Sequence, residues 1–312
     1  MSRVLPYLGG KSQVAPEIIS RFPKGPKTYV EPFFGGGGVF FTLPPGTYTT
    51  RVANDINHNV VTFFRVLRSR VEELEEVCRL TPYAKQEWSD CGQLSAGLDI
   101  TKPDDELELA RRLWVRQSQG FAGRQEGGSP CWARKGAKGP DLAGRAVKSI
   151  GMFQEASDWL SGVEVDCLDA LEFIGKYAGP DCFIYEDPPY VPETRVGKSY
   201  DHEPDEAWHK ELCELNLACS EAGSLIALSG YDNEIYNDVL KGWRKESFER
   251  YAPSAMGAIE KRRMEVLWLN YPANVELGDR WKQPVLKARS KNDQALLSKI
   301  KARGRRDSIK NH

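Results

Sequence analysis

Residues 182–190 place the strictest limit on how this chain folds. They begin with an apolar run, Cys182-Phe183-Ile184-Tyr185, which is typical of a short buried strand. Two prolines follow Glu186 and Asp187, and the strand must end there because proline cannot donate to a strand ladder and fixes its own backbone angle. Asp187 and the ring of Tyr190 are therefore expected at the carboxyl end of a strand, the edge of an open α/β sheet at which ligands bind.

This group of atoms suits the chemistry of an aromatic amine. The exocyclic amino nitrogen of adenine is a weak nucleophile, because its lone pair is delocalised into the ring. Asp187 and the Pro188 carbonyl, accepting its two hydrogens, would move that nitrogen toward a tetrahedral state. Tyr190 would stack on the base, which must leave its duplex to arrive there. The alternative interpretation is a strand that ends at a Pro-Pro turn, with Tyr190 as a packing residue.

A second stretch, residues 28–40, runs from a short strand through Glu31, Pro32 and Phe33 into four glycines. A strand, a glycine turn and a helix form the nucleotide-cradling arrangement of doubly wound sheets, although the spacing here is not the dinucleotide fingerprint. Glu31 would repel a pyrophosphate and suits a positively charged ligand such as S-adenosylmethionine. Asp55 ends the next expected strand, at the offset that suits ribose hydroxyls; alternatively it or Asn57 caps a helix.

The loop at residues 6–12 ends in Gly10-Lys11-Ser12, which resembles the end of a phosphate-binding P-loop. Leu5 stands where that motif needs a glycine, so we do not expect an ATP site. Lys11 can still approach a ligand carboxylate or a DNA phosphate, and Tyr7 can cover an adenine ring or a cation.

Composition excludes several classes of protein. The chain has 312 residues, 40% of them hydrophobic, with no long apolar run and no apolar signal core at its start, so we expect a cytoplasmic protein. Its seven cysteines form no Cys-x-x-Cys pair, which argues against zinc and for reduced thiols. We therefore expect no metal and no membrane partner.

Charge is unevenly distributed, although the formal net charge is only −1. Residues 111–148 contain nine basic and two acidic side chains, with Phe121 and Trp132 interleaved, and residues 280–312 contain eleven basic and two acidic ones. Basic residues and aromatics on a glycine-rich loop are typical of contact with phosphates and unstacked bases, but also of a solvated loop. The predicted DNA contacts are Arg116, Arg124, Arg134, Lys135, Lys138, Arg195 and Lys198.

Periodicity predicts the remaining elements. A long amphipathic helix is expected over residues 57–80, and further helices over 12–22, 82–97, 104–120, 203–222 and 232–240. Strands are expected over 163–166, 224–229, 243–251 and 264–270. Asp104 and Asp169 are expected to cap helices, and Asp169 could also accept a bond from a cofactor's adenine amino group.

In this order, the motifs resemble those of the Dam-like DNA adenine-amino methyltransferases, especially the phage and prophage members. The matching motifs are Pro-Tyr-Leu-Gly-Gly-Lys, Val-Glu-Pro-Phe-Phe-Gly-Gly-Gly, Asn-Asp-Ile-Asn, Asp169, Asp-Pro-Pro-Tyr and Lys-Arg-Arg-Met-Glu-Val-Leu-Trp. The resemblance implies an α/β fold: a Rossmann-like class I methyltransferase core, doubly wound and mostly parallel, with a helical target-recognition insertion. It also implies site-specific methylation of adenine N6 in DNA, with S-adenosylmethionine as the methyl donor.

The resemblance assigns roles by position. Catalytic roles fall to Asp187, Pro188, Pro189 and Tyr190, and cofactor binding to Tyr7, Lys11, Glu31, Phe33, Gly35, Gly37, Asp55, Asp169 and Asp187. Pro6 stands where some members that read GATC carry a DNA-contacting lysine, so GATC is not carried over as the target.

The expected domains are a catalytic domain over 1–80 and 161–275, a DNA-reading insertion over 81–160, and a basic tail over 276–312. We expect a monomer or weak dimer acting on double-stranded DNA, with or without a cognate restriction enzyme. The alternatives are a methyltransferase for RNA or a protein amide, and a DNA-binding relative that has lost catalysis.

Overall fold

The structure is a computed structural model that describes residues 4–7, 10–120, 132–133, 141–192, 204–252 and 261–273, with the backbone alone for 250–252 and 261–263. The expectations for the tail at 276–312, and for Arg124, Arg134, Lys135, Lys138, Arg195 and Lys198, lie outside these residues.

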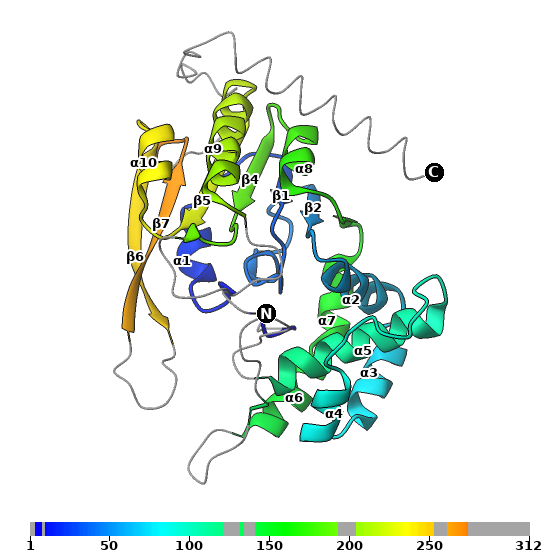
Figure 1. The fold of residues 1–312 in the computed structure, drawn as a ribbon. Coiled ribbons are helices and arrows are strands. Elements are labelled where there is room, and N and C mark those ends of the chain that lie inside the picture. The colour runs from blue at the N-terminus through cyan, green and yellow to red at the C-terminus, as the bar shows by residue number, and fades with distance from the viewer. Residues whose placement is uncertain are drawn as a thin grey trace.

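A seven-stranded sheet with the strand order β3-β2-β1-β4-β5-β7-β6 forms the centre of the molecule (Figure 1). The strands are β1 (Thr28–Glu31), β2 (Thr50–Asn54), β3 (Glu164–Asp166), β4 (Cys182–Glu186), β5 (Leu225–Gly230), β6 (Arg244–Ala252) and β7 (Lys261–Leu269). The first five are parallel to one another, whereas β7 runs antiparallel to both β5 and β6. This mostly parallel sheet is the predicted core of a class I methyltransferase.

Apolar side chains point alternately to the two faces of the sheet, so both faces are buried. On β4, Phe183 and Tyr185 pack into one hydrophobic cluster and Ile184 into another, and on β1 Tyr29 and Val30 divide in the same way. Successive side chains of a strand point to opposite faces, so apolar residues at every position require helices on both sides. The chain is therefore doubly wound, and its strand ends share one edge.

Ten α-helices surround the sheet within the described residues. They are α1 (Ala15–Ile19), α2 (His58–Ser69), α3 (Val71–Leu80), α4 (Lys85–Asp90), α5 (Pro103–Gln119), α6 (Leu142–Ile150), α7 (Phe153–Leu160), α8 (Ala170–Lys176), α9 (Glu206–Glu221) and α10 (Glu234–Val239). Figure 1 shows α8, α9 and α10 on the upper part of the sheet and α3 to α6 gathered below it. None of the described helices is both long and apolar enough to span a bilayer.

Three helix predictions were wrong in extent. The helix expected over 57–80 breaks at Arg70, whose ψ of 43° is not helical. Residues 82–97 are helical only over α4, and 12–22 only over α1. Asp104 does not cap α5, because the helix begins one residue earlier at Pro103, as proline favours the first helical position. The glycine turn leads only into a short 3-10 turn (Phe40–Thr42).

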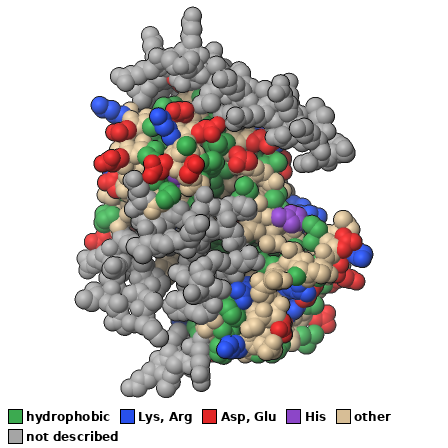
Figure 2. All heavy atoms as spheres, viewed as in Figure 1, with side chains coloured by type: hydrophobic (Ala, Val, Ile, Leu, Met, Phe, Trp, Pro, Cys, Tyr) green, Lys and Arg blue, Asp and Glu red, His purple; other side chains and the backbone are tan. Residues whose placement is uncertain are grey.

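The face of the upper helices is acidic. Figure 2 shows acidic side chains gathered on the upper part of the molecule, where Figure 1 places α8, α9 and α10. Glu206, Glu234 and Asp238 are exposed there. A phosphate backbone is repelled by such a surface, so nucleic acid is expected to approach from another side.

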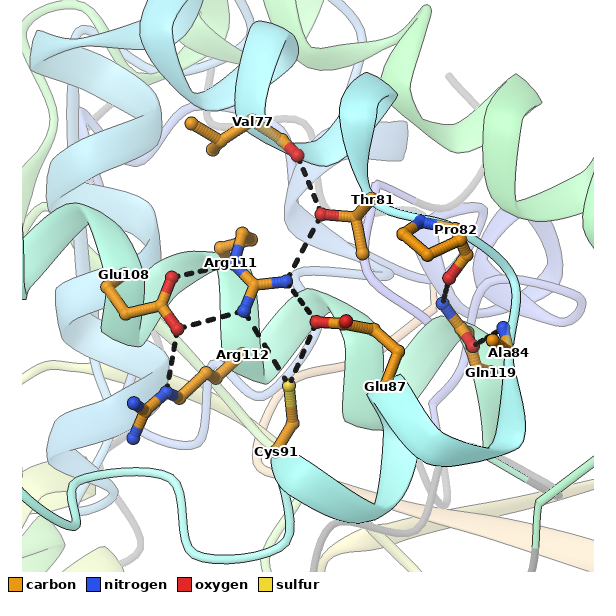
Figure 3. A network of polar contacts seen from close by, with 10 residues as sticks. All are labelled: Val77, Thr81, Pro82, Ala84, Glu87, Cys91, Glu108, Arg111, Arg112 and Gln119. Carbon is orange, nitrogen blue, oxygen red and sulfur yellow. Dashed lines mark hydrogen bonds and ion pairs between the residues drawn. The ribbon is translucent and has the colours of Figure 1, made fainter.

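Arg111 ties three helices of the lower group together (Figure 3). Its guanidinium donates to both carboxylate oxygens of Glu108, at 2.6 and 2.9 Å, and to Glu87 on α4 at 2.5 Å. It also donates to the hydroxyl of Thr81, which caps α3, at 3.2 Å. A planar fork with several donors suits this arrangement, and an ammonium group does not.

We therefore expect Arg111→Lys to lower the free energy of unfolding by about 1–3 kcal/mol, because Glu87 or Glu108 would keep a half-buried carboxylate without its partner. Urea denaturation measures the loss. Arg145→Lys, at an exposed position on α6, is the control and should change little. Equal stability of the two variants would contradict the role assigned to Arg111.

Candidate active site

Lys11 is a buried cation at the centre of the carboxyl edge of the sheet. Only 3% of its surface is exposed, and its ammonium donates to the Asp187 carboxylate and, at 2.8 Å, to the Tyr190 hydroxyl. Glu265 Oε1 lies 3.3 Å from the same nitrogen. The loop that carries Lys11 thus contacts the strand end that carries Asp187, although 176 residues separate the two in sequence.

The electrostatics keep this lysine charged. Burial on its own would lower the pKa of Lys11, but the charges of Asp187 and then Glu265 hold it well above the normal value. A buried charge is tolerated only when it is paired and hydrogen-bonded, and Lys11 has two acids and a hydroxyl for that purpose.

Glu265, on β7, is a site residue that sequence reasoning missed. It is fully buried, and the hydroxyls of Tyr190 and Ser229 donate to its carboxylate at 3.2 and 3.0 Å. The sequence did contain a signal, because Glu265 directly precedes the apolar run Val266-Leu267-Trp268 of a strand. An acid at such a position is expected to be buried, and a buried carboxylate requires a partner.

Glu31 is a second buried acid, at the end of β1. It is 2% exposed, and the Tyr29 hydroxyl donates to it at 2.5 Å. Burial raises the pKa of Glu31 well above its normal value, and the nearby charge of Asp187 raises it further. A cation bound beside these two acids would relieve both effects, so this part of the site fits a positively charged ligand.

Asp55 holds the glycine turn in place. Its carboxylate accepts from the Gly35 amide at 2.7 Å and from the Asn57 amide at 2.8 Å, while Asn57 caps α2 as predicted. Gly35 and Gly37 have φ values of +51° and +65°, which L side chains rarely adopt. A Cβ on Gly35 would lie 3.0 Å from the ring of Tyr7, so the turn, Asp55 and Tyr7 form one unit.

Asn54, also missed by sequence reasoning, joins the ends of neighbouring strands. Its amide donates to the carbonyls of Pro32 and Leu168, at 3.1 and 3.0 Å, and accepts from the Leu168 amide. These bonds hold Phe33 and Asp169 close to the glycine turn. Asp169 caps α8 by accepting from the Leu171 amide at 2.9 Å, which confirms the predicted cap, and Phe33 packs edge-on against Trp208.

The remaining predicted catalytic residues lie at the same edge. Pro188 is buried, Pro189 is half-buried, and the Asp187 side chain is 19% exposed. The ring of Tyr190 is stacked on Tyr231, with 4.1 Å between centroids and 29° between planes. The structure therefore brings Lys11, Asp187 and Tyr190 into direct contact.

Arg116 does not fit its predicted role in DNA binding. It is 3% exposed, its guanidinium lies 3.8 Å from the centroid of the Trp88 ring, and it donates to the Trp88 carbonyl at 3.0 Å. Arg116 joins α5 to α4 inside the insertion, because its helix position faces inward and its long stem packs along an indole.

Comparison with known proteins finds a partial match to one family and several similar proteins. The model of the D12 class N6 adenine-specific DNA methyltransferases matches residues 7–92. The type II methyltransferase M1.LlaDCHI of Lactococcus lactis is 28% identical over 63% of this chain and 69% of its own length. A DNA adenine methylase of Haemophilus influenzae is 22% identical, over 76% and 82%, and a DNA N-6-adenine-methyltransferase of Escherichia phage P1 is 26% identical, over 81% and 33%.

Over residues 7–92, this chain is similar to the D12 class N6 adenine-specific DNA methyltransferases. It is therefore an enzyme that methylates adenine N6 in DNA. The family match at residues 7–92 contains Tyr7, Lys11, Glu31, the glycine turn and Asp55, which the fold places at one edge. Asp187 and Tyr190 lie outside the matched residues and join them through Lys11.

A substitution at Gly37 tests how tightly the glycine turn of this methyltransferase is packed. A Cβ there would come within 2.5 Å of the Phe41 ring, in addition to the strain of a positive φ. Gly46 has a similar φ of +73° but nothing within 4 Å of a built Cβ, so it is a matched control. Gly46→Ala should cost about 1–2 kcal/mol of unfolding free energy, and Gly37→Ala about 1–3 kcal/mol more. Equal losses in urea denaturation would contradict the packing described for the turn.

Glu186 is a buried acid directly before Asp187. Asn216 on α9 donates to its Oε2 at 2.7 Å, whereas Glu186 Oε1 and Asn216 Oδ1 have no hydrogen-bond partner among the described residues. Burial raises the pKa of Glu186 to about 8. Because burial favours the uncharged form of a carboxyl group, the environment of Glu186 fits a neutral acid.

This gives a pH prediction. Unfolded Glu186 loses its proton near pH 4.5 and folded Glu186 near pH 8, so the unfolded state binds fewer protons between those values. The contribution of Glu186 to the free energy of unfolding must therefore decline as pH rises through this range. Glu186→Gln keeps a donor and an acceptor and cannot titrate. Its stability relative to the wild type should rise from pH 5 to pH 8 in urea denaturation, and parallel curves would contradict a neutral Glu186.

Proposed function

We propose that this enzyme takes its methyl group from S-adenosylmethionine and transfers it to an adenine that has left the DNA duplex and lies against Asp187. The observation that carries the proposal is the contact of Lys11 with Asp187 and Tyr190. It places residues suited to hold an aromatic amine beside the acidic glycine-turn end of the sheet.

The residues at that end fit the proposed cofactor. Glu31 is a buried acid, and none of the described groups that shift its pKa is a cation. Residues 35–38 are all glycines, so the turn has no side chains that would block a nucleoside. Asp55, Tyr7 and Phe33 would contact the nucleoside, while Glu31 would face the charged end. Bound there, S-adenosylmethionine supplies a methyl group activated by its sulfonium.

Asp187 and the carbonyl of Pro188 would prepare the amine. Each accepts one of the two hydrogens on adenine N6, which draws the lone pair out of conjugation and toward the incoming methyl carbon. The nitrogen would form one C–N bond as the bond from that carbon to the donor's sulfur breaks, with its electron pair left on sulfur. The nitrogen then loses one proton, for which Asp187 is the adjacent acceptor. Lys11 orients the Asp187 carboxylate through a charged hydrogen bond.

Base flipping follows from where Asp187 lies. The amino group of a paired adenine is engaged inside the duplex, and enzymes that act on such atoms extrude the nucleotide into a pocket. Asp187 sits at the end of a central strand, and only 19% of its side chain is exposed, which supports recognition of an extruded base rather than a stacked one. Tyr190 would then give the extruded base a surface to stack on.

The contacts of α5 support our proposal that the insertion reads DNA at this edge. Arg70, which ends α2, pairs with Asp104 in the first turn of α5, and Arg65 pairs with Glu106. The helices are thus antiparallel, and at 1.5 Å per residue the end of α5 is level with the start of α2, next to Asp55.

Gly120 bridges to Trp132, so these two described residues meet at that level. We retain Arg124, Arg134, Lys135 and Lys138, with Arg195 and Lys198, as proposed phosphate contacts. The acidic face of α9 and α10 favours approach from the opposite side.

Asp187→Asn tests the mechanism. The amide keeps the size of the side chain but replaces an acceptor with a donor, so tritium transfer from labelled S-adenosylmethionine to unmethylated plasmid DNA should fall at least about 100-fold. Asp158→Asn, which removes a charge from the exposed face of α7, is the control and should keep full activity. Calorimetry with the same cofactor checks that the Asp187→Asn variant still folds and binds.

Retained transfer by Asp187→Asn would contradict the mechanism. Transfer to RNA in preference to duplex DNA, in a competition between the two polymers, would contradict DNA as the substrate. A wild-type protein that gives no heat with S-adenosylmethionine would contradict the proposed donor.

A further inference from the structure

The paired strands β6 and β7 continue past the carboxyl edge of the sheet. Strand β5 ends at Gly230, which pairs with Val266 of β7, whereas β7 begins five residues earlier at Lys261. Because β7 runs antiparallel to β5, residues 261–265 lie beyond the end of β5, and residues 248–252 of β6 pair with them. These two ranges are called the β6–β7 arm below. At about 3.4 Å per residue, the arm reaches roughly 17 Å further along the strand direction than β5 does.

The arm begins at the candidate active site. Glu265 holds its carboxylate 3.3 Å from the ammonium of Lys11. Its cross-strand partner is Phe248, whose ring centroid lies 5.2 Å from the guanidinium carbon of Arg21, just after α1. Figure 1 shows β6 and β7 descending past the lower ends of β4 and β5 on the left, and α3 to α6 gathered on the lower right. The arm and the insertion thus lie on opposite sides of this edge.

The outer part of the arm is basic. Residues 250–252 and 261–263 contain four basic residues and no acid, namely Arg250, Lys261, Arg262 and Arg263. Arg250 and Arg263 are directly opposite each other in the register of the two strands. Like charges at opposed positions destabilise a pair of strands, so this arrangement is unfavourable for the arm on its own. A bound polyanion would remove that penalty.

The register also assigns the arginine pair to one face of the arm. Side chains alternate along a strand, so positions 250 and 263 share the face of Phe248 and Glu265, two residues inward. Phe248 belongs to the hydrophobic cluster that also contains Leu109 of α5. The two positions are therefore on the side of the sheet where the insertion packs. The acidic helices α9 and α10 pack against the opposite face.

We propose that the β6–β7 arm binds the DNA backbone on the side of the site opposite the insertion, with Arg250 and Arg263 as phosphate contacts. This inference rests on the proposed function, because it requires that the base bound at Asp187 belong to a DNA duplex. The guanidinium fork matches the geometry of a phosphate, and phosphate contacts fix the position of a protein on the duplex without reading its sequence. In this arrangement the insertion reads bases, and the arm positions the duplex over Asp187.

The salt dependence of binding measures such contacts. The double variant Arg250→Gln/Arg263→Gln loses two phosphate contacts, and each contact contributes about 0.9 to the slope of log K against log salt concentration. Fluorescence anisotropy with a labelled duplex should therefore give a slope that is smaller by about 2. At about 0.1 M salt the affinity should fall on the order of 10- to 100-fold. Two duplexes of unrelated sequence should be affected equally, because phosphate contacts do not distinguish bases.

Matched variants separate this role from effects of total charge and of folding. Lys210→Gln/Lys241→Gln also removes two positive charges, from exposed positions on α9 and before β6, and should keep the wild-type slope and affinity. Arg250→Gln/Arg263→Gln relieves two opposed like charges, so its midpoint in urea denaturation should equal or exceed that of the wild type.

The outcomes distinguish failure of this inference from failure of the proposed function. If the wild type binds duplex DNA and Arg250→Gln/Arg263→Gln keeps its slope, the role of the arm is overturned and the proposed function stands. A urea midpoint that falls together with the affinity would also overturn it, because the arginines would then be structural. If the wild type itself has no affinity for duplex DNA, the proposed function fails, and the role of the arm fails with it.

Discussion

The candidate active site depends on one buried ammonium group that contacts residues from separate segments of the chain. Lys11 comes from the loop before α1, Asp187 and Tyr190 from the end of β4, and Glu265 from β7. A lysine with 3% exposure is stable only because these acceptors surround it, so each segment constrains the others. Segments from the start of the chain and from β7 thus meet at this single charge.

The charges around Lys11 also divide the edge of the sheet into two chemical halves. On the side of β1 and β2, the acids Glu31 and Asp55 and the open glycine turn suit a cationic nucleoside. On the side of β4 and β5, Asp187, Pro188 and two tyrosines suit a planar neutral amine. Glu186, next to Asp187 in sequence but pointing into the contact with Asn216, fits a neutral acid and so adds no second negative charge to the amine side. In the proposed reaction, a methyl group carried on a cation and the base that receives it meet where these halves join.

The sequence was sufficient for the architecture and for most of the site. Apolar runs that end in Glu31, Asp55 and Asp187 predicted parallel strands with acids at one edge, because strand ends and prolines leave a strong local signal. The sequence was insufficient where contacts between distant segments determine the partners and orientation of a residue. Glu265 and Asn54 act through partners far along the chain, Arg116 turned inward to stack on Trp88, and the helix at 57–80 breaks at Arg70 although its apolar spacing continues. The contact of Tyr190 with Tyr231, between loops of different strands, had no counterpart in any local pattern.

The most direct measurement of the central claim is the detection of modified bases in genomic DNA from cells that express the protein. With the wild-type chain, the account predicts N6-methyladenine at one defined sequence throughout the genome, and none above background with the Asp187→Asn variant. Methylation of cytosine, or N6-methyladenine that persists with the Asp187→Asn variant, would contradict it.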